Sequence, residues 1–285
     1  VVGVLREKST DTDTRTQGVT HRHTHTMQGG RHILSSNQAA EQRGQRLLVC
    51  AGQLDEEGLR RMLQSVDTDP NYMDREQRNT PLLTALFARL DGRPERSEDK
   101  ICACIRALVD HGADVNIARS SDGTFPLQVA AQRGFLKAVN LLLDLGAKVD
   151  MQNFLMQTAL HAAAARGHVD VVRLLTDRGA PVDDCAKNGM TPLMQACKLN
   201  HSAVAILLVE LGANVNQVCE QGDCPLLWCA ELGLVDVLER ILPLIQDVNI
   251  VRSADQSNAL HVAVRKSRLE VCGRKAPRLD WVPCL

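Results

Sequence analysis

The sequence predicts an all-α repeat solenoid, in which pairs of short helices stack in a row and are joined by hairpin loops. Two motifs recur every 33 residues and keep the same phase. Aromatic residues make up only 2% of the 285 residues, so the core must be built from Leu, Val, Ile and Ala, which suits closely stacked helices. One such unit cannot bury its own apolar face, and stacking on neighbouring units supplies the core.

The first motif is a Gly-Ala pair followed by an extended segment. It begins at Gly146, Gly179 and Gly212, and an earlier copy begins at Gly112, 34 residues before Gly146. Glycine fits a left-handed helix C-cap, after which the chain leaves the helix. Each copy therefore predicts the end of one helix pair and the start of a hairpin.

The second motif is a Thr-Pro-Leu-like segment, which begins at Phe125, Thr158, Thr191 and Cys224. A Thr side chain caps exposed backbone N–H groups, and Pro suits the first helical position because its missing N–H is not needed there. Each copy predicts the start of the first helix of a pair. An apolar stripe such as residues 171–175 predicts the second helix.

Together these motifs resemble the ankyrin repeat family over residues 44–272. The resemblance implies an ankyrin solenoid of about five to six helix-turn-helix units with short β-hairpin loops. An earlier unit starts at Thr80, but Pro81 lies 45 residues before Pro126. The extra residues predict a charged insertion at 88–100, between the two helices of that unit.

The outermost units depart from the pattern. Residues 46–69 read as a degenerate helix pair, which we interpret as an N-terminal cap. Asn258 opens a further unit, but no second helix or Gly-Ala cap follows it. Residues 273–285 are therefore expected to form an irregular C-terminal tail, consistent with a truncated array.

Residues 1–43 are rich in Thr, Gln, Arg and His with little periodicity, and they predict a disordered tail. Alternate histidines in this tail are compatible with metal binding, but an unstructured polar tail is the simpler interpretation. These histidines are His21, His23, His25 and His32. Met27 is a candidate start of the mature protein, because the chain begins without Met.

The charge and cysteine content favour an intracellular protein, cytoplasmic or nuclear. The formal net charge is -1, which favours neither nucleic acid nor a membrane surface, and the longest apolar run is too short to span a bilayer. The patterns bury four of the ten cysteines in the core, so we expect mostly free thiols in a reducing compartment. These core cysteines are Cys102, Cys104, Cys197 and Cys229.

No residue cluster predicts an enzyme, a metal site or a cofactor. Cys219, Cys224 and Cys229 are five residues apart, which is not the spacing of zinc ligands. Family resemblance implies that His161 and His261 hydrogen-bond between adjacent hairpins. A basic C-terminal region leaves nucleic-acid binding as a rival, but no aromatic residues are interleaved with the basic ones for base stacking. That region contains Arg265, Lys266, Arg268, Arg274, Lys275 and Arg278.

The resemblance implies a function in protein recognition on the concave face, where hairpin tips and the exposed edges of first helices lie. We expect a monomeric scaffold or adaptor without catalytic activity. Alternatives are the substrate-recruiting arm of a ubiquitin ligase, which needs a further box, and the ankyrin part of a larger enzyme such as a kinase. The expected partner-binding residues are Asp122, Arg133, Phe154, Leu155, Gln157, Arg166, Lys187, Asn188, Met190, Lys198, Leu199, Glu220, Gln221, Asp223, Glu231 and Leu232.

Two features of this face invite a sharper interpretation. Phe154 and Leu155 place adjacent apolar side chains at a hairpin tip, either as an interface hot spot or as packing on the neighbouring tip. Along the first helices, basic residues give way to Glu231, which would orient a partner with acidic and then basic segments. Scattered surface charge is an equally simple explanation.

Asn116 is a candidate modification site. It ends the segment 108–116, which is similar to ankyrin segments hydroxylated on Asn by an oxygen-dependent hydroxylase. We expect the intact mass of the protein from oxygenated cells to include a species heavier by one oxygen atom.

Overall fold

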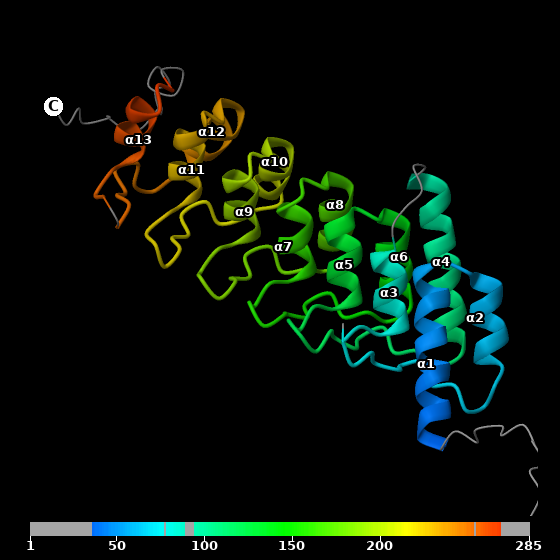
Figure 1. Ribbon diagram of the computed structural model, residues 1–285. Coiled ribbons are helices and arrows are strands. Elements are labelled where there is room, and N and C mark those ends of the chain that lie inside the picture. Colours follow the sequence, from blue (N-terminus) through cyan, green and yellow to red (C-terminus); the bar gives the residue numbers. More distant parts are fainter. Residues whose placement is uncertain (1–35, 77, 89–93, 254, 269–285) are drawn as a thin grey trace, which may run out of the picture. The chain divides into compact units, whose positions relative to one another are not determined.

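The computed structural model describes residues 36–76, 78–88, 94–253 and 255–268. Helices alternate as the first and second members of successive pairs (Figure 1). The first helices are α1 (Ser36–Gly52), α3 (Pro81–Phe87), α5 (Pro126–Arg133), α7 (Ala159–Ala164), α9 (Pro192–Lys198), α11 (Pro225–Leu232) and α13 (Ala259–Arg265). The second helices are α2 (Glu56–Leu63), α4 (Pro94–Asp110), α6 (Leu136–Asp144), α8 (Val169–Asp177), α10 (Ser202–Glu210) and α12 (Val235–Ile241), and a 3-10 turn, η1 (Leu242–Leu244), follows α12.

The helices of residues 36–268 form two layers. Each first helix packs against the first helix of the next pair, and each second helix from α2 to α12 does the same with the next second helix. Helices α5, α7 and α9 follow one another in this way (Figure 1). The predicted repeat solenoid is therefore confirmed, and the hairpins between pairs are brought into a row beside the first helices.

The caps explain why each first helix begins where it does. The side-chain oxygens of Thr80, Thr158 and Thr191 each accept a hydrogen bond from the backbone N–H three residues later. Phe125 cannot do this, and the Gln128 side chain accepts from the Phe125 N–H instead, at 3.0 Å. Replacing the capping Thr therefore leaves the start of α5 unchanged.

The core contains small and branched apolar side chains. Ala130, Ala163 and Ala196 are completely buried at equivalent positions of three first helices, where a methyl group allows close helix contact. Leu160 and Leu193 fill the space between pairs and are also fully buried. The four cysteines predicted to be core residues are buried, and each described cysteine has a free thiol.

Two helix boundaries differ from the sequence prediction. Helix α1 begins at Ser36, so residues 36–43 are helical; Ala39, Ala40 and Glu41 are good helix formers, and the ring of Tyr72 packs where Gly44 has no side chain. Residues 94–100 of the expected charged insertion are helical and extend α4, which has 17 residues. The remaining part of the predicted tail, the histidine group and residues 269–285 lie outside the described residues.

The hairpins are built from turns. Within the described residues, the only bridge between extended segments is an isolated antiparallel one joining Val251 and Asn258. The predicted hairpin loops are therefore present without paired strands, apart from this bridge. Main-chain hydrogen bonds such as that from Gly123 N–H to Arg119 O, at 2.8 Å, close them as turns.

Candidate protein-interaction face

Main-chain hydrogen bonds link successive hairpin tips. Each bond runs from a backbone N–H of one tip to a carbonyl oxygen of the preceding tip. The tips are thus held in register, and side chains at equivalent positions lie in a row. The bonds are Phe154 to Asp122 at 3.1 Å, Lys187 to Leu155 at 2.9 Å and Glu220 to Asn188 at 3.2 Å.

His161 fixes two units relative to each other. Its Nδ1 accepts from the Thr158 N–H at 3.2 Å, and its Nε2 donates to the Met190 carbonyl of the next hairpin at 3.1 Å. Burial lowers the pKa of His161 below its usual 6.5, and the bond to Met190 opposes this. The predicted structural role of His161 is confirmed. His261 is exposed and bonds within its own unit, to the Asn258 N–H at 3.4 Å.

Asn116 belongs to a second set of links between units. Its Nδ2 donates to the Gly146 carbonyl at 3.1 Å, and its Oδ1 accepts from the Lys148 N–H at 3.0 Å. Asn71 and Asn216 bond to the next unit in the same way. Both the nitrogen and the oxygen of the Asn116 side-chain amide are thus engaged, and hydroxylation of Asn116 stays a prediction.

A third set of links was missed by the sequence analysis. His168 Nε2 donates to the Gln132 carbonyl at 3.1 Å, and His201 Nε2 donates to the Ala165 carbonyl at 3.1 Å. Each ring lies against a glycine of the preceding unit, Gly134 or Gly167, which leaves no space there for a Cβ atom. The 33-residue spacing of the two histidines was the available signal.

Most of the predicted partner-binding residues are accessible. Asp122, Gln157, Glu231 and Leu232 are half-buried, and ten others are exposed. Met190 and Asp223 are each only 4% exposed, so the prediction that they face outward is wrong. Met190 packs with Met194 and Cys219, while Asp223 is covered by an ion pair. The exposed ten are Arg133, Phe154, Leu155, Arg166, Lys187, Asn188, Lys198, Leu199, Glu220 and Gln221.

An apolar hairpin tip stands out on this face. Phe154, Leu155 and Met156 are 64%, 57% and 46% exposed. One part of the Phe154 ring rests on Gly123 of the preceding tip, where a Cβ atom would lie 2.6 Å from the ring. Phe154 therefore packs on its neighbour, as one interpretation predicted, and still presents most of its surface to solvent; its role as an interface hot spot stays a prediction.

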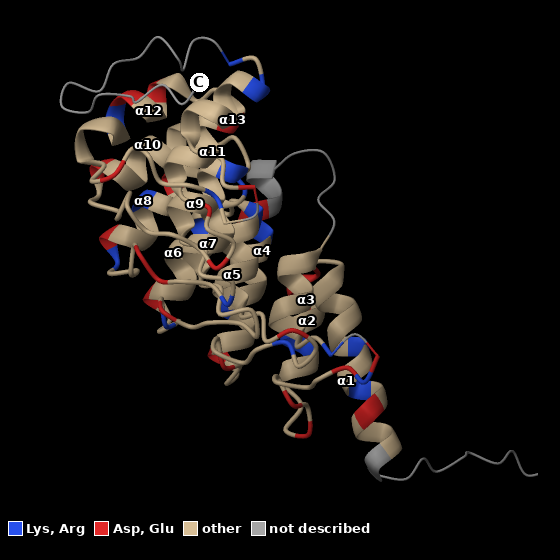
Figure 2. Ribbon diagram, turned by 90° about the vertical axis from the view of Figure 1, so that its left-hand side faces the viewer, with Lys and Arg blue, Asp and Glu red and all other residues tan. Residues whose placement is uncertain are grey.

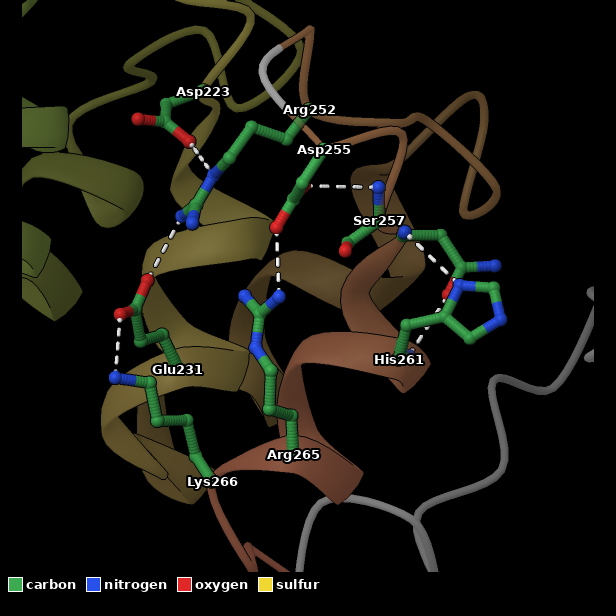
Figure 3. Close-up of polar contacts among 9 residues, drawn as sticks. Asp223, Glu231, Arg252, Asp255, Ser257, His261, Arg265 and Lys266 are labelled. Atoms are coloured by element: carbon green, nitrogen blue, oxygen red, sulfur yellow. Dashed lines mark hydrogen bonds and ion pairs between the residues drawn. The ribbon is translucent and has the colours of Figure 1, made fainter.

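The C-terminal end of the face is occupied by its own ion pairs. Arg252 donates from Nε to Asp223 and from Nη2 to Glu231, at 2.8 Å, and Lys266 lies 3.2 Å from the other oxygen of Glu231 (Figure 3). The hydrogen bond from Arg252 holds the pKa of Glu231 below its usual value, although burial opposes it. Arg265 and the Ser257 N–H lower the pKa of the neighbouring Asp255 to about 2.

These pairs change the predicted charge gradient. Glu231 is already matched by Arg252 and Lys266, so it does not present a free negative charge. Arg166 and Lys198 have no carboxylate within ion-pair distance among the described residues. Lys198 lies over the Trp228 ring, 5.1 Å from its centroid. Figure 2 marks the Lys, Arg, Asp and Glu segments on the ribbon.

A pocket of about 270 Å³ opens beside the apolar tip. It lies among the first helices α5, α7 and α9 and the hairpin before α7, and four glutamines contribute to its wall, together with Leu155 and Asn153. These glutamines are Gln128, Gln132, Gln157 and Gln195. A larger groove of about 700 Å³ lies over the second helices α4, α6 and α8. Two of its acidic residues, Asp99 and Asp144, are paired with Lys137 and Arg178.

The described residues show neither a metal centre nor a membrane span. No group of three His, Cys, Asp or Glu side chains among them could hold a metal ion. No helix found in that part of the chain combines the length and the apolar character that crossing a bilayer requires.

The stacked helix pairs and their row of tips define a repeat solenoid with an extended interaction face. A family model described as ankyrin repeats (3 copies) matches residues 47–153 and 148–219, and the chain belongs to the ankyrin repeat family. Ankyrin repeats are generally protein-interaction modules, and domains of this family are typically non-catalytic.

Two similar proteins extend this finding. The human ankyrin repeat and SOCS box protein 18 is 44% identical over 59 residues, which cover 21% of this chain and only 13% of that protein. The crystal structure of an ankyrin repeat domain from Acinetobacter baumannii has a TM-score of 0.59 at 28% identity. That match covers 69% of this chain and 95% of the bacterial domain.

Proposed function

We propose that this chain is a non-catalytic scaffold or adaptor that binds a protein partner on the face formed by hairpin tips and first helices. The exposed tip of Phe154, Leu155 and Met156 is the observation that carries the proposal. Buried aromatic and apolar anchors supply most of the binding energy of protein interfaces, about 2 kcal/mol or more for each hot-spot residue. A row of tips held in register positions such an anchor with a smaller loss of conformational entropy at binding.

Affinity purification with mass spectrometry tests this function. The full chain is compared with a Phe154→Glu, Leu155→Glu variant, and Val66→Glu, Leu244→Glu serves as a matched control at exposed apolar residues outside this face. We expect the first variant to lose a partner that the wild type and the control both capture. Both substituted pairs are exposed, so unfolding free energies should stay within about 0.5 kcal/mol of the wild type. Identical partners in all three samples would contradict the proposal.

An alternative function is substrate recruitment for a ubiquitin ligase. The observation in its favour is the similarity over 59 residues to a protein named for ankyrin repeats and a SOCS box. The two functions differ in the fate of the bound partner. Depletion of this chain from cells would raise the abundance of a ligase substrate, whereas the partner of a scaffold would keep its abundance and lose its co-localised proteins.

A further inference from the structure

We propose that the pocket beside the apolar tip holds the main chain of an extended, acidic segment of the partner, with one apolar side chain of that segment on Phe154, Leu155 and Met156. This inference rests on the proposed function and names the chemistry of the partner. Four observations carry it: the size of the pocket, its free amide groups, the unpaired basic residues beside it and the apolar tip.

The pocket is too small for a folded domain or a large ligand. Its volume of about 270 Å³ lies below the range of about 300–1,000 Å³ that is typical of small-molecule sites. It is bounded by three successive first helices, and neighbouring helices lie about 8–10 Å apart. A single extended strand of polypeptide fits a space of this volume and can cross several units.

The walls offer amide groups without partners. Gln132, Gln157 and Gln195 make no side-chain hydrogen bond within the described residues. By contrast, Gln128 bonds to Phe125, Met151 and Gln157, so it holds the wall in place. A side-chain amide has both donors and an acceptor, which match the C=O and N–H of a peptide group. Three free amides in one pocket are therefore suited to a main chain of any sequence.

Charge selects among possible segments. Arg166 follows the pocket residue Ala165, and Lys198 lies three residues after the pocket residue Gln195 on the same helix, so both flank the pocket. Neither has a carboxylate partner among the described residues, and Lys187 at the next tip is also exposed without one. Asp122, an acidic residue of the pocket wall, is matched by Arg119 at 3.6 Å. These unpaired basic residues favour an acidic segment.

The apolar tip supplies the anchor. The Leu155 carbonyl is bonded to the Lys187 N–H at 2.9 Å, and Met156 has a left-handed backbone with φ of 57°. These constraints hold the loop while its side chains stay exposed. Leu155 also lines the pocket, so the tip and the amide groups form one continuous surface. An apolar side chain on the tip places its own main chain beside the glutamines.

Selection from a displayed library of random dodecapeptides on the full chain tests the preferred chemistry. We expect enriched peptides to carry more Asp and Glu than Lys and Arg, with one Leu, Ile, Met or Phe. Their affinity should fall about tenfold or more in an Arg166→Glu, Lys198→Glu variant and should weaken with added salt. An Arg106→Glu, Arg173→Glu variant reverses the same amount of charge on the second helices and should bind normally.

A double-mutant cycle tests the main-chain contact. Single peptide bonds of an enriched peptide are N-methylated, which removes one N–H, and binding is measured to the wild type and to Gln132→Met, Gln195→Met. We expect at least one methylation to weaken wild-type binding about tenfold and to have little effect in the variant, because the two changes remove one contact. Gln64→Met, at an exposed glutamine far along the chain, should behave like the wild type.

Three results would overturn the inference: no enriched peptide, enrichment of basic peptides, or strictly additive effects in the cycle. Tighter binding of a single-stranded oligothymidylate than of any peptide, lost in Arg166→Glu, Lys198→Glu, would also overturn it in favour of nucleic acid. The proposed function fails separately, when Phe154→Glu, Leu155→Glu keeps every protein partner. A partner lost in that variant without any peptide binding would show a folded surface as the ligand.

Discussion

The centre and the C-terminal end of the face use equivalent positions in opposite ways. Gln157 and Asp223 each precede the start of a first helix, yet Gln157 keeps a free amide and Asp223 is buried under Arg252. Lys198 is unpaired at the end of α9, whereas Glu231 in the next unit is matched by two bases. The repeat fixes where a side chain lies. The neighbouring unit decides whether that side chain is available to a partner.

The largest effect should come from the core of the central units. Leu160→Ala removes a fully buried side chain between pairs and should lower the free energy of unfolding by about 2–5 kcal/mol. Val262→Ala in α13 should mainly increase opening of the last unit, because that helix packs mainly on α11. Urea unfolding followed by amide hydrogen exchange measures both. If the two variants raise hydrogen-exchange rates equally along the whole chain, the expected difference between the central units and the last unit is wrong.

A smaller effect is expected at the C-terminal ion pairs. Arg252→Met leaves Asp223 buried without its partner and should cost about 2–3 kcal/mol, confined to α11 and α13. Adding Asp223→Asn should recover part of this loss, since a neutral amide is less costly to bury than a charge. Arg265→Met breaks an exposed pair with Asp255 and should leave the urea midpoint nearly unchanged. Equal losses in Arg252→Met and Arg265→Met would refute the assignment.

The smallest effect is a difference in acid sensitivity. The folded pKa of His161 is lowered, so its contribution to stability is fully present above 6.5 and is lost as the pH falls from 6.5 towards the folded pKa. The folded pKa of Glu231 is lowered too, and its contribution is present above 4.5 and is lost below it. Hydrogen exchange should therefore show the centre loosening at a higher pH than the C-terminal unit.

Two variants check the assignment of these steps. His161→Gln should remove the loss of protection that occurs at the higher pH, and Glu231→Gln should remove the loss that occurs at the lower pH. If both variants lose protection at both pH values as the wild type does, other groups control the acid response.

The sequence predicted the stacked helix pairs because their signals are local and periodic. Thr158, Pro192 and Gly146 act within a few residues of where they stand, and the 33-residue period then dictates the stacking. The length of α4 and the start of α1 were missed, since charged helix formers in an insertion resemble a loop. The ion pair between Arg252 and Asp223 was not predicted either, because the two residues are 29 apart in the sequence and only the folded hairpin brings them together.

The contact between a histidine and a glycine of the preceding unit limits how the number of repeats can change. Each contact joins residues 34 apart, Gly134 with His168 and Gly167 with His201, so it crosses a unit boundary. Duplication of residues 168–200 would place His201 against Asn200 of the first copy, which has a left-handed backbone and a side chain where the existing pairs have glycine. Unequal recombination that adds this particular unit thus creates a mismatched joint, and the added unit requires a compensating substitution at residue 200.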